Sequence, residues 1–135
     1  MSVNEVLRGA AETLAGVDLL VVFGSAARGS DRPRSDVDVG VRLRDDSPVA
    51  RRAVELALGR SLRREVDVVY LDEAPPLLRF QIARDGVLIH QAAPHLWPNF
   101  RARAMLDWWD WASTFRTIHD AGLRRLRRQA GGGPA

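Results

Sequence analysis

The spacing of apolar and polar residues changes along the chain, and each change marks a predicted element. Residues 4–15 repeat apolar side chains at helical spacing, with Asn4 placed to cap the helix and Gly16 to end it. Residues 17–23 form an almost unbroken apolar run of strand formers, which predicts a strand buried on both faces. Residues 36–43 alternate strictly between aliphatic side chains and polar or small ones, which predicts a half-buried strand.

The rest of the chain continues to alternate between helices and strands. Ser47 and Pro48 supply a helix cap and a first helical residue, and we expect this helix to end at Gly59. The remaining predicted elements are a strand at 66–71, a helix at 75–84, a strand at 87–90 and one long helix from Pro98 onward. This order predicts an α+β domain on a small mixed sheet.

The long C-terminal helix carries apolar side chains along one face. They are spaced by alternating fours and threes at Ala104, Trp108, Trp111, Phe115 and Ile118. Four tryptophans lie on or near this helix, at positions 97, 108, 109 and 111, and we expect one stripe of them to pack on the sheet. Trp108 and Trp109 cannot face the same core, because neighbours on a helix point about 100° apart. Some aromatic surface is therefore expected to remain for a protein partner.

The chain of 135 residues is long enough for one domain with a helical appendage, since domains commonly have about 100–150 residues. We predict a domain at 1–92, a helical extension at 93–129 that packs on it or on a partner, and a disordered tail at 130–135. The absence of cysteine excludes disulfides, thiolate metal sites and a cysteine nucleophile. No signal peptide or membrane-spanning run is evident, so we expect a cytoplasmic protein without a membrane partner.

The net charge is only +3, and every basic residue is arginine. The absence of lysine excludes Schiff-base chemistry and a phosphate-binding lysine of the P-loop type. The excess positive charge lies in Arg124, Arg125, Arg127 and Arg128. We interpret this cluster as a solvated basic tail, with contact to RNA or to an acidic partner as the alternative. No nucleic-acid-binding module is recognisable, so direct nucleic-acid binding is not expected.

The segment between the first two strands carries the candidate chemistry. Gly24 and Ser25 follow a buried strand, where glycine permits a close backbone approach and exposed N–H groups can bind phosphate oxygens. Ten residues later, Asp36 and Asp38 stand two apart, which places both carboxylates on one face of the next strand. Mg²⁺ prefers oxygen ligands, typically carboxylates together with substrate phosphates and water. The pattern therefore predicts metal-assisted phosphoryl transfer.

Asp67 is a third candidate, because it is the one acid inside the apolar run at 66–71. If this strand lies beside the strand of Asp36 and Asp38, the Asp67 carboxylate can help to hold a second metal ion and to deprotonate an attacking hydroxyl. The alternative is a solvated acid on the exposed face of an edge strand.

These residues resemble the minimal nucleotidyltransferases of the DNA polymerase beta superfamily, whose signature is Gly-Ser, about ten residues, and Asp-x-Asp. The short chain, together with Ala27-Arg28-Gly29 and Ser35-Asp36, further resembles the MNT-domain antitoxins, which pair with HEPN-domain ribonuclease toxins. The resemblance covers roughly residues 5–92. It implies a polymerase-beta-like fold, with a small mixed sheet flanked by helices.

The resemblance also implies a function and a set of site residues. The expected reaction is the transfer of AMP from ATP to a tyrosine hydroxyl of a cognate HEPN toxin, with two Mg²⁺ ions as cofactor. The implied roles are triphosphate binding by Gly24 and Ser25, metal binding by Asp36 and Asp38, the third acidic position at Asp67, and nucleotide contacts from Arg28 and Ser35.

Two other functions stay open. One is nucleotide transfer to a small molecule such as an aminoglycoside, which the resemblance disfavours because those enzymes usually carry a larger acceptor-binding domain. The other is a non-catalytic antitoxin that neutralises its partner by binding alone. Asp36 and Asp38 argue against it, since masking requires no metal site.

Overall fold

A single mixed sheet forms the centre of the molecule. The computed structural model describes residues 1–27 and 36–131, and within them four strands lie in the order β3-β2-β1-β4. The strands are β1 (Val17–Phe23), β2 (Val37–Leu43), β3 (Val66–Tyr70) and β4 (Val87–Gln91). β1 pairs antiparallel with both β2 and β4, whereas β2 and β3 run parallel.

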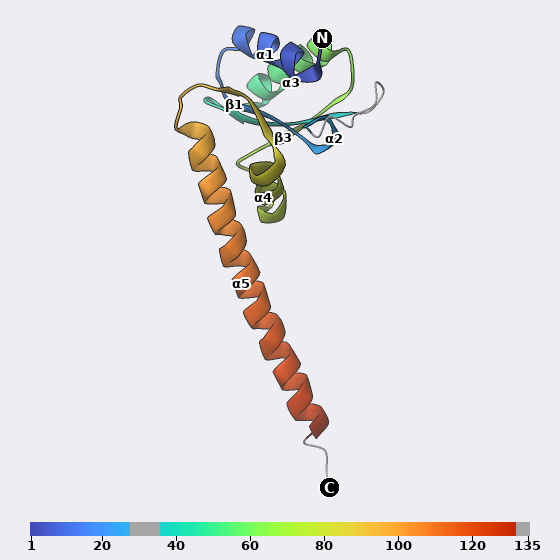
Figure 1. Cartoon of the computed structure of the whole chain (residues 1–135), viewed down its shortest axis with the longest axis vertical. Helices are drawn as coiled ribbons and strands as arrows, with labels where there is room; N and C mark the ends of the chain where they lie inside the picture. Colours follow the sequence, from blue (N-terminus) through green and yellow to red (C-terminus); the bar gives the residue numbers. More distant parts are fainter. Residues whose placement is uncertain (28–35, 132–135) are drawn as a thin grey trace.

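Helices cover both faces of this sheet. They are α1 (Val3–Thr13), α2 (Gly24–Ala27), α3 (Pro48–Leu62), α4 (Pro76–Asp85) and α5 (Leu96–Gly131). In Figure 1, α1 and α3 lie on one side of the sheet and α4 on the other, while α5 runs past α4 and away from the domain. The predicted α+β class, with a small mixed sheet and a long C-terminal helix, is confirmed.

Each face of the sheet has its own apolar core. The core beneath α1 and α3 includes Leu7, Leu20, Val22, Val37, Val39, Val41 and Leu58. The core beneath α4 and α5 includes Leu19, Val21, Leu71, Ile82, Phe100 and Ala104. β1 is thus buried on both faces, as predicted.

The second strand differs from its prediction, because its polar face is covered over part of its length. Gly40 is buried, and a Cβ atom added there would stand 2.6 Å from Cδ2 of Leu71. The glycine therefore allows Leu71 to close the core beneath α4. The end of β2 that carries Asp38 keeps part of this face open, since Asp38 is only partly buried, and this is the end where the candidate site lies.

Several helix boundaries also differ from the predictions, among them the start of α1 and the end of α3. α1 is capped by Ser2, not by Asn4, since the Glu5 N–H donates to Ser2 Oγ at 3.2 Å. α3 begins at Pro48 with Ser47 as its cap, as predicted, but it continues through Gly59 to Leu62. A glycine inside a helix costs only about 1 kcal/mol.

The first part of α5 packs on α4. Arg79 of α4 forms an ion pair with Asp107, and the Arg101 Nε–H donates to the Ala83 carbonyl at 2.9 Å. The Phe80 and Trp108 rings stack with their centres 5.5 Å apart. These contacts fix the direction in which the helix leaves the domain.

Trp97 and Ala104 pack in the core beneath α4 and α5. Beyond Trp108 the helix departs from the sheet, so the prediction that the stripe packs there is wrong for its later members. Trp111, Phe115 and Ile118 are 48%, 55% and 67% exposed. The helix includes Ala130 and Gly131, and residues 132–135 lie outside the described part. None of the helices within residues 1–27 and 36–131 combines the length and apolar character needed to cross a membrane.

Candidate active site

The pairing of β2 with β3 brings two acids together. Asp38 and Asp67 are direct partners in the parallel register. Both side chains lie on the sheet face that α4 covers, because their strand neighbours Val37, Val39, Val66 and Val68 pack in the opposite core. β3 therefore lies beside β2, which is the arrangement that Asp67 needs in order to reach the site of Asp36 and Asp38.

The Asp38 carboxylate lies within the electrostatic influence of Asp36 and Asp67. Asp36 precedes β2 and is exposed, as is Asp67, while Asp38 is partly buried. Burial, followed by the charges of Asp67 and Asp36, raises the pKa of the Asp38 carboxyl above its usual range. Within the described residues none of the three forms an ion pair with an arginine. A cation bound at this cluster would relieve the repulsion that Asp67 and Asp36 exert on Asp38.

The Gly24 turn lies directly against this cluster. Phe23 and Asp38 are partners in the β1–β2 ladder, so Gly24 follows at the same end of the sheet. Gly24 has a φ of +72°, and a Cβ atom added there would stand 2.5 Å from Asp38 Oδ2. Only glycine fits this conformation and this space without strain. The atom that a Cβ at Gly24 would meet first belongs to Asp38, so the turn and the acid are in close contact.

Three of the predicted nucleotide contacts are not described by the structure. Arg28 and Ser35 lie outside the described residues, and the Ser25 side chain is likewise not described. Ser25 itself falls within α2, which begins at Gly24.

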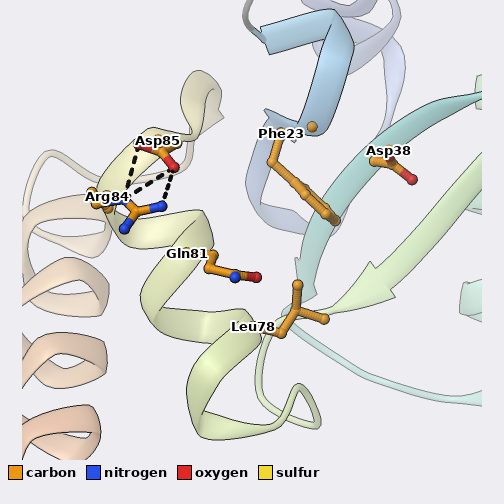
Figure 2. Close-up of a pocket in the computed structure, with 7 residues that line it drawn as sticks. Phe23, Asp38, Leu78, Gln81, Arg84 and Asp85 are labelled. Carbon is orange, nitrogen blue, oxygen red and sulfur yellow. Dashed lines mark hydrogen bonds and ion pairs between the residues drawn. The ribbon is translucent and has the colours of Figure 1, made fainter.

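A pocket of about 320 Å³ opens beside Asp38. One wall is formed by Phe23, Gly24 and Asp38 at the end of the sheet, and the other by Leu78, Gln81, Arg84 and Asp85 of α4 (Figure 2). The α4 residues were not identified from the sequence, because polar positions on an amphipathic helix cannot be distinguished there from an ordinary solvated face. The packing of α4 across the sheet places them opposite Asp38.

The acidic cluster fits a magnesium ion in its chemistry. Carboxylate oxygens are the donors that Mg²⁺ prefers, and this ion usually takes its remaining ligands from substrate phosphates and water. In the described part of the chain, no group of three or more histidine, cysteine or acidic side chains is placed so that it could hold a metal ion by itself. A site completed by a nucleotide agrees with both observations, since Asp36, Asp38 and Asp67 would supply only part of the coordination.

Comparisons with known proteins agree with this geometry. The family model described as polymerase beta, nucleotidyltransferase, matches residues 5–95. No curated protein matches the chain.

Several solved structures share the fold. A toxin–antitoxin complex with AMP-PNP contains a chain with 21% identity and a TM-score of 0.71, over 91% of this chain and 99% of that one. A tri-AMPylated HEPN toxin from Shewanella oneidensis, in complex with an MNT antitoxin, gives 20% identity and a TM-score of 0.64, over 90% and 95% of the two chains. A structure described as a minimal nucleotidyltransferase is 32% identical, with a TM-score of 0.54, over 64% of this chain and 95% of that one. With a family match over most of its length and the signature residues gathered at one end of the sheet, the chain belongs to the polymerase beta nucleotidyltransferase family.

Proposed function

We propose that this protein is a Mg²⁺-dependent adenylyltransferase that transfers AMP from ATP to a tyrosine hydroxyl of a HEPN-domain toxin and thereby neutralises it. The observation that carries the proposal is the register of Asp38 with Asp67, directly beside the Gly24 turn. Family membership supports nucleotidyl transfer. The choice of ATP and of a toxin acceptor is supported by the two toxin–antitoxin structures of the same fold, one with AMP-PNP and one with an AMPylated toxin.

Different residues bind the triphosphate and the metal ion in this proposal. The backbone N–H groups of the turn at Gly24 and Ser25 bind the triphosphate, with Arg28 and Ser35 as further phosphate contacts. Asp36, Asp38 and Asp67 would hold Mg²⁺, which when bound neutralises the phosphate charge and stabilises the leaving pyrophosphate.

The oxygen of the tyrosine hydroxyl attacks the α-phosphorus, and Asp67 accepts the proton of that hydroxyl. The bond between the α-phosphorus and its bridging oxygen breaks, and pyrophosphate leaves. The products are the AMP ester of tyrosine and pyrophosphate.

The free part of α5 is where the toxin binds in this proposal. Trp108, Trp111 and Phe115 stack in series, with ring centres 5.2 and 5.4 Å apart, and the row continues to His119 at 6.1 Å. Large aromatic side chains in an exposed row are typical anchors of protein interfaces. The alignment with the toxin–antitoxin structure covers 91% of the chain, so it extends well into α5. The arginines at the end of α5 favour an acidic surface on the partner.

The test is the intact mass of the toxin after incubation with this protein, ATP and Mg²⁺. We expect mass increments of AMP that map to tyrosine and that disappear with the Asp36→Asn/Asp38→Asn double variant. Asp45→Asn is the matched control, because Asp45 is an exposed acid in the loop before α3 and should leave the increments unchanged.

The alternatives give different results in the same experiment. If the toxin gains no mass and the double variant still binds and neutralises it, the protein acts by masking. If AMP is transferred to an aminoglycoside but not to the toxin, the acceptor is a small molecule.

A further inference from the structure

The order of the strands separates two sides of the candidate site. Asp38 lies on β2, with Asp67 beside it on β3 and with Phe23 beside it on β1. The phosphate-binding turn begins at Gly24, at the end of β1. In the proposed function the triphosphate therefore lies on the β1 side of Asp38, and the acceptor hydroxyl meets Asp67 on the β3 side.

The pocket of about 320 Å³ lies on the β1 side. Phe23 and Gly24 line it, together with Asp38, whereas no residue of β3 does. Its volume is at the lower end of the range of small-ligand pockets, which begins at about 300 Å³. A ligand that fills it is adjacent in space to the phosphate-binding turn, as the nucleoside of a bound nucleotide would be.

The walls of the pocket suit a flat aromatic base. Phe23 and Leu78 provide apolar surface from opposite sides, one from β1 and one from α4 (Figure 2). Both side chains are only partly buried, so each still presents apolar surface to a ligand. Bases stack on aromatic side chains regardless of their identity, so Phe23 contributes affinity and not selectivity.

Gln81 is the group that can provide selectivity. Its side chain extends from α4 toward the space between Phe23 and Leu78 (Figure 2). Its amide makes no hydrogen bond within the described part of the chain. Arg84, one turn further along, is instead bound to Asp85 at 2.7 Å and lies over the Phe80 ring. The pocket thus contains a neutral amide whose donor and acceptor are both available.

We propose that this pocket binds the adenine nucleoside of ATP and that Gln81 determines the choice of base. This inference deepens the proposed function and rests on it. A glutamine amide matches the N6 donor and N7 acceptor of adenine, whereas guanine presents two acceptors at its corresponding edge.

The test measures binding without catalysis, by calorimetric titration of the protein with AMP-PNP and with GMP-PNP in the presence of Mg²⁺ and without toxin. The wild type is expected to bind AMP-PNP at least about tenfold more tightly than GMP-PNP, the usual discrimination of a bidentate amide–base pair. Gln81→Met keeps the length and apolar stem of the side chain but removes the amide. This variant should lose the preference and bind AMP-PNP about tenfold more weakly. Gln129→Ala, on the exposed end of α5, is the control and should behave as the wild type.

Two outcomes would overturn the inference while leaving the proposed function intact. One is that Gln81→Met binds both analogues as the wild type does. The other is that this variant raises the KM for the toxin and not the KM for ATP, which would assign the pocket to the acceptor. A wild-type protein that binds neither analogue would instead refute the proposed function as well.

Discussion

Replacing Gly24 by alanine tests the contact between the turn and the acidic cluster. Gly24 has a φ of +72°, and a residue with a side chain costs about 1–2 kcal/mol in this left-handed region. The new Cβ would stand 2.5 Å from Asp38 Oδ2, whereas ordinary contact begins at 3.4 Å. The Asp38 carboxylate must therefore move by roughly 1 Å, a displacement that can cost about 100-fold in rate at a catalytic group.

We expect Gly24→Ala to lower the free energy of unfolding by about 1–3 kcal/mol and the rate of AMP transfer by about 100-fold. Urea unfolding and the initial rate of toxin modification measure the two effects. Gly59→Ala is the matched control, because Gly59 lies inside α3 and a Cβ atom there would meet nothing within 4 Å. This change should raise stability by about 0.5–1 kcal/mol and leave the rate unchanged.

A double variant separates the two parts of this cost. In the Asp38→Ala background the carboxylate is absent, so Gly24→Ala should lower the free energy of unfolding only through the strain of its left-handed backbone. The loss should then be smaller than in the wild type. If Gly24→Ala lowers the free energy of unfolding equally in both backgrounds, the contact with Asp38 does not contribute to the loss of stability. A Gly24→Ala protein that transfers AMP at the wild-type rate would refute the assigned role of the close approach.

The remaining predictions concern the charge on Asp38, the aromatic face of α5 and the tyrosine of this chain. Burial and then Asp67 raise the pKa of Asp38, so the folded protein keeps this proton to a higher pH than the unfolded chain does, and the free energy of unfolding should fall as the pH rises from 3.8 through the raised pKa. Asp38→Asn removes this titration and should increase Tm at neutral pH. Thermal melts that show no increase would count against this reasoning. Phe115→Ser should leave Tm nearly unchanged, since Phe115 is 55% exposed. The same change should weaken toxin binding at least tenfold in a direct titration, and unaltered affinity would remove α5 from the interface. Tyr70, the only tyrosine in the chain, donates its hydroxyl to Glu55 at 2.7 Å on the face opposite Asp38, so peptide mapping after incubation with ATP should find it unmodified.

Local patterns in the sequence were sufficient for most of the elements. The apolar run of β1 requires cover on both faces, and two helix-packed cores provide it. Ser47 and Pro48 define the start of α3 through one cap hydrogen bond, in which the Ala50 N–H donates to Ser47 Oγ at 3.1 Å. The period of two in a strand predicts that Asp36 and Asp38 share one face, and in the structure Asp38 lies in β2 while Asp36 directly precedes it.

Helix ends and the aromatic stripe were decided by packing. Gly59 is an acceptable helix end, but α3 continues past it, and the turn that follows brings partly buried Leu62 against the core. The stripe on α5 has the period of a buried face, yet only its first turns meet α4. A period specifies that a face is apolar and does not specify what covers it.

The candidate site also contains residues that local sequence patterns indicate and residues that only the packing of the elements brings in. Gly24, Asp36 and Asp38 were evident from the sequence, because a short segment contains the turn, the spacing and the strand that relate them. The place of Asp67 depended on the parallel pairing of β3 with β2, and that of Gln81 on the packing of α4 across the end of the sheet. Residues close in sequence are related by the geometry of one element, whereas residues from different elements come together only when the burial of both apolar faces fixes how those elements pack.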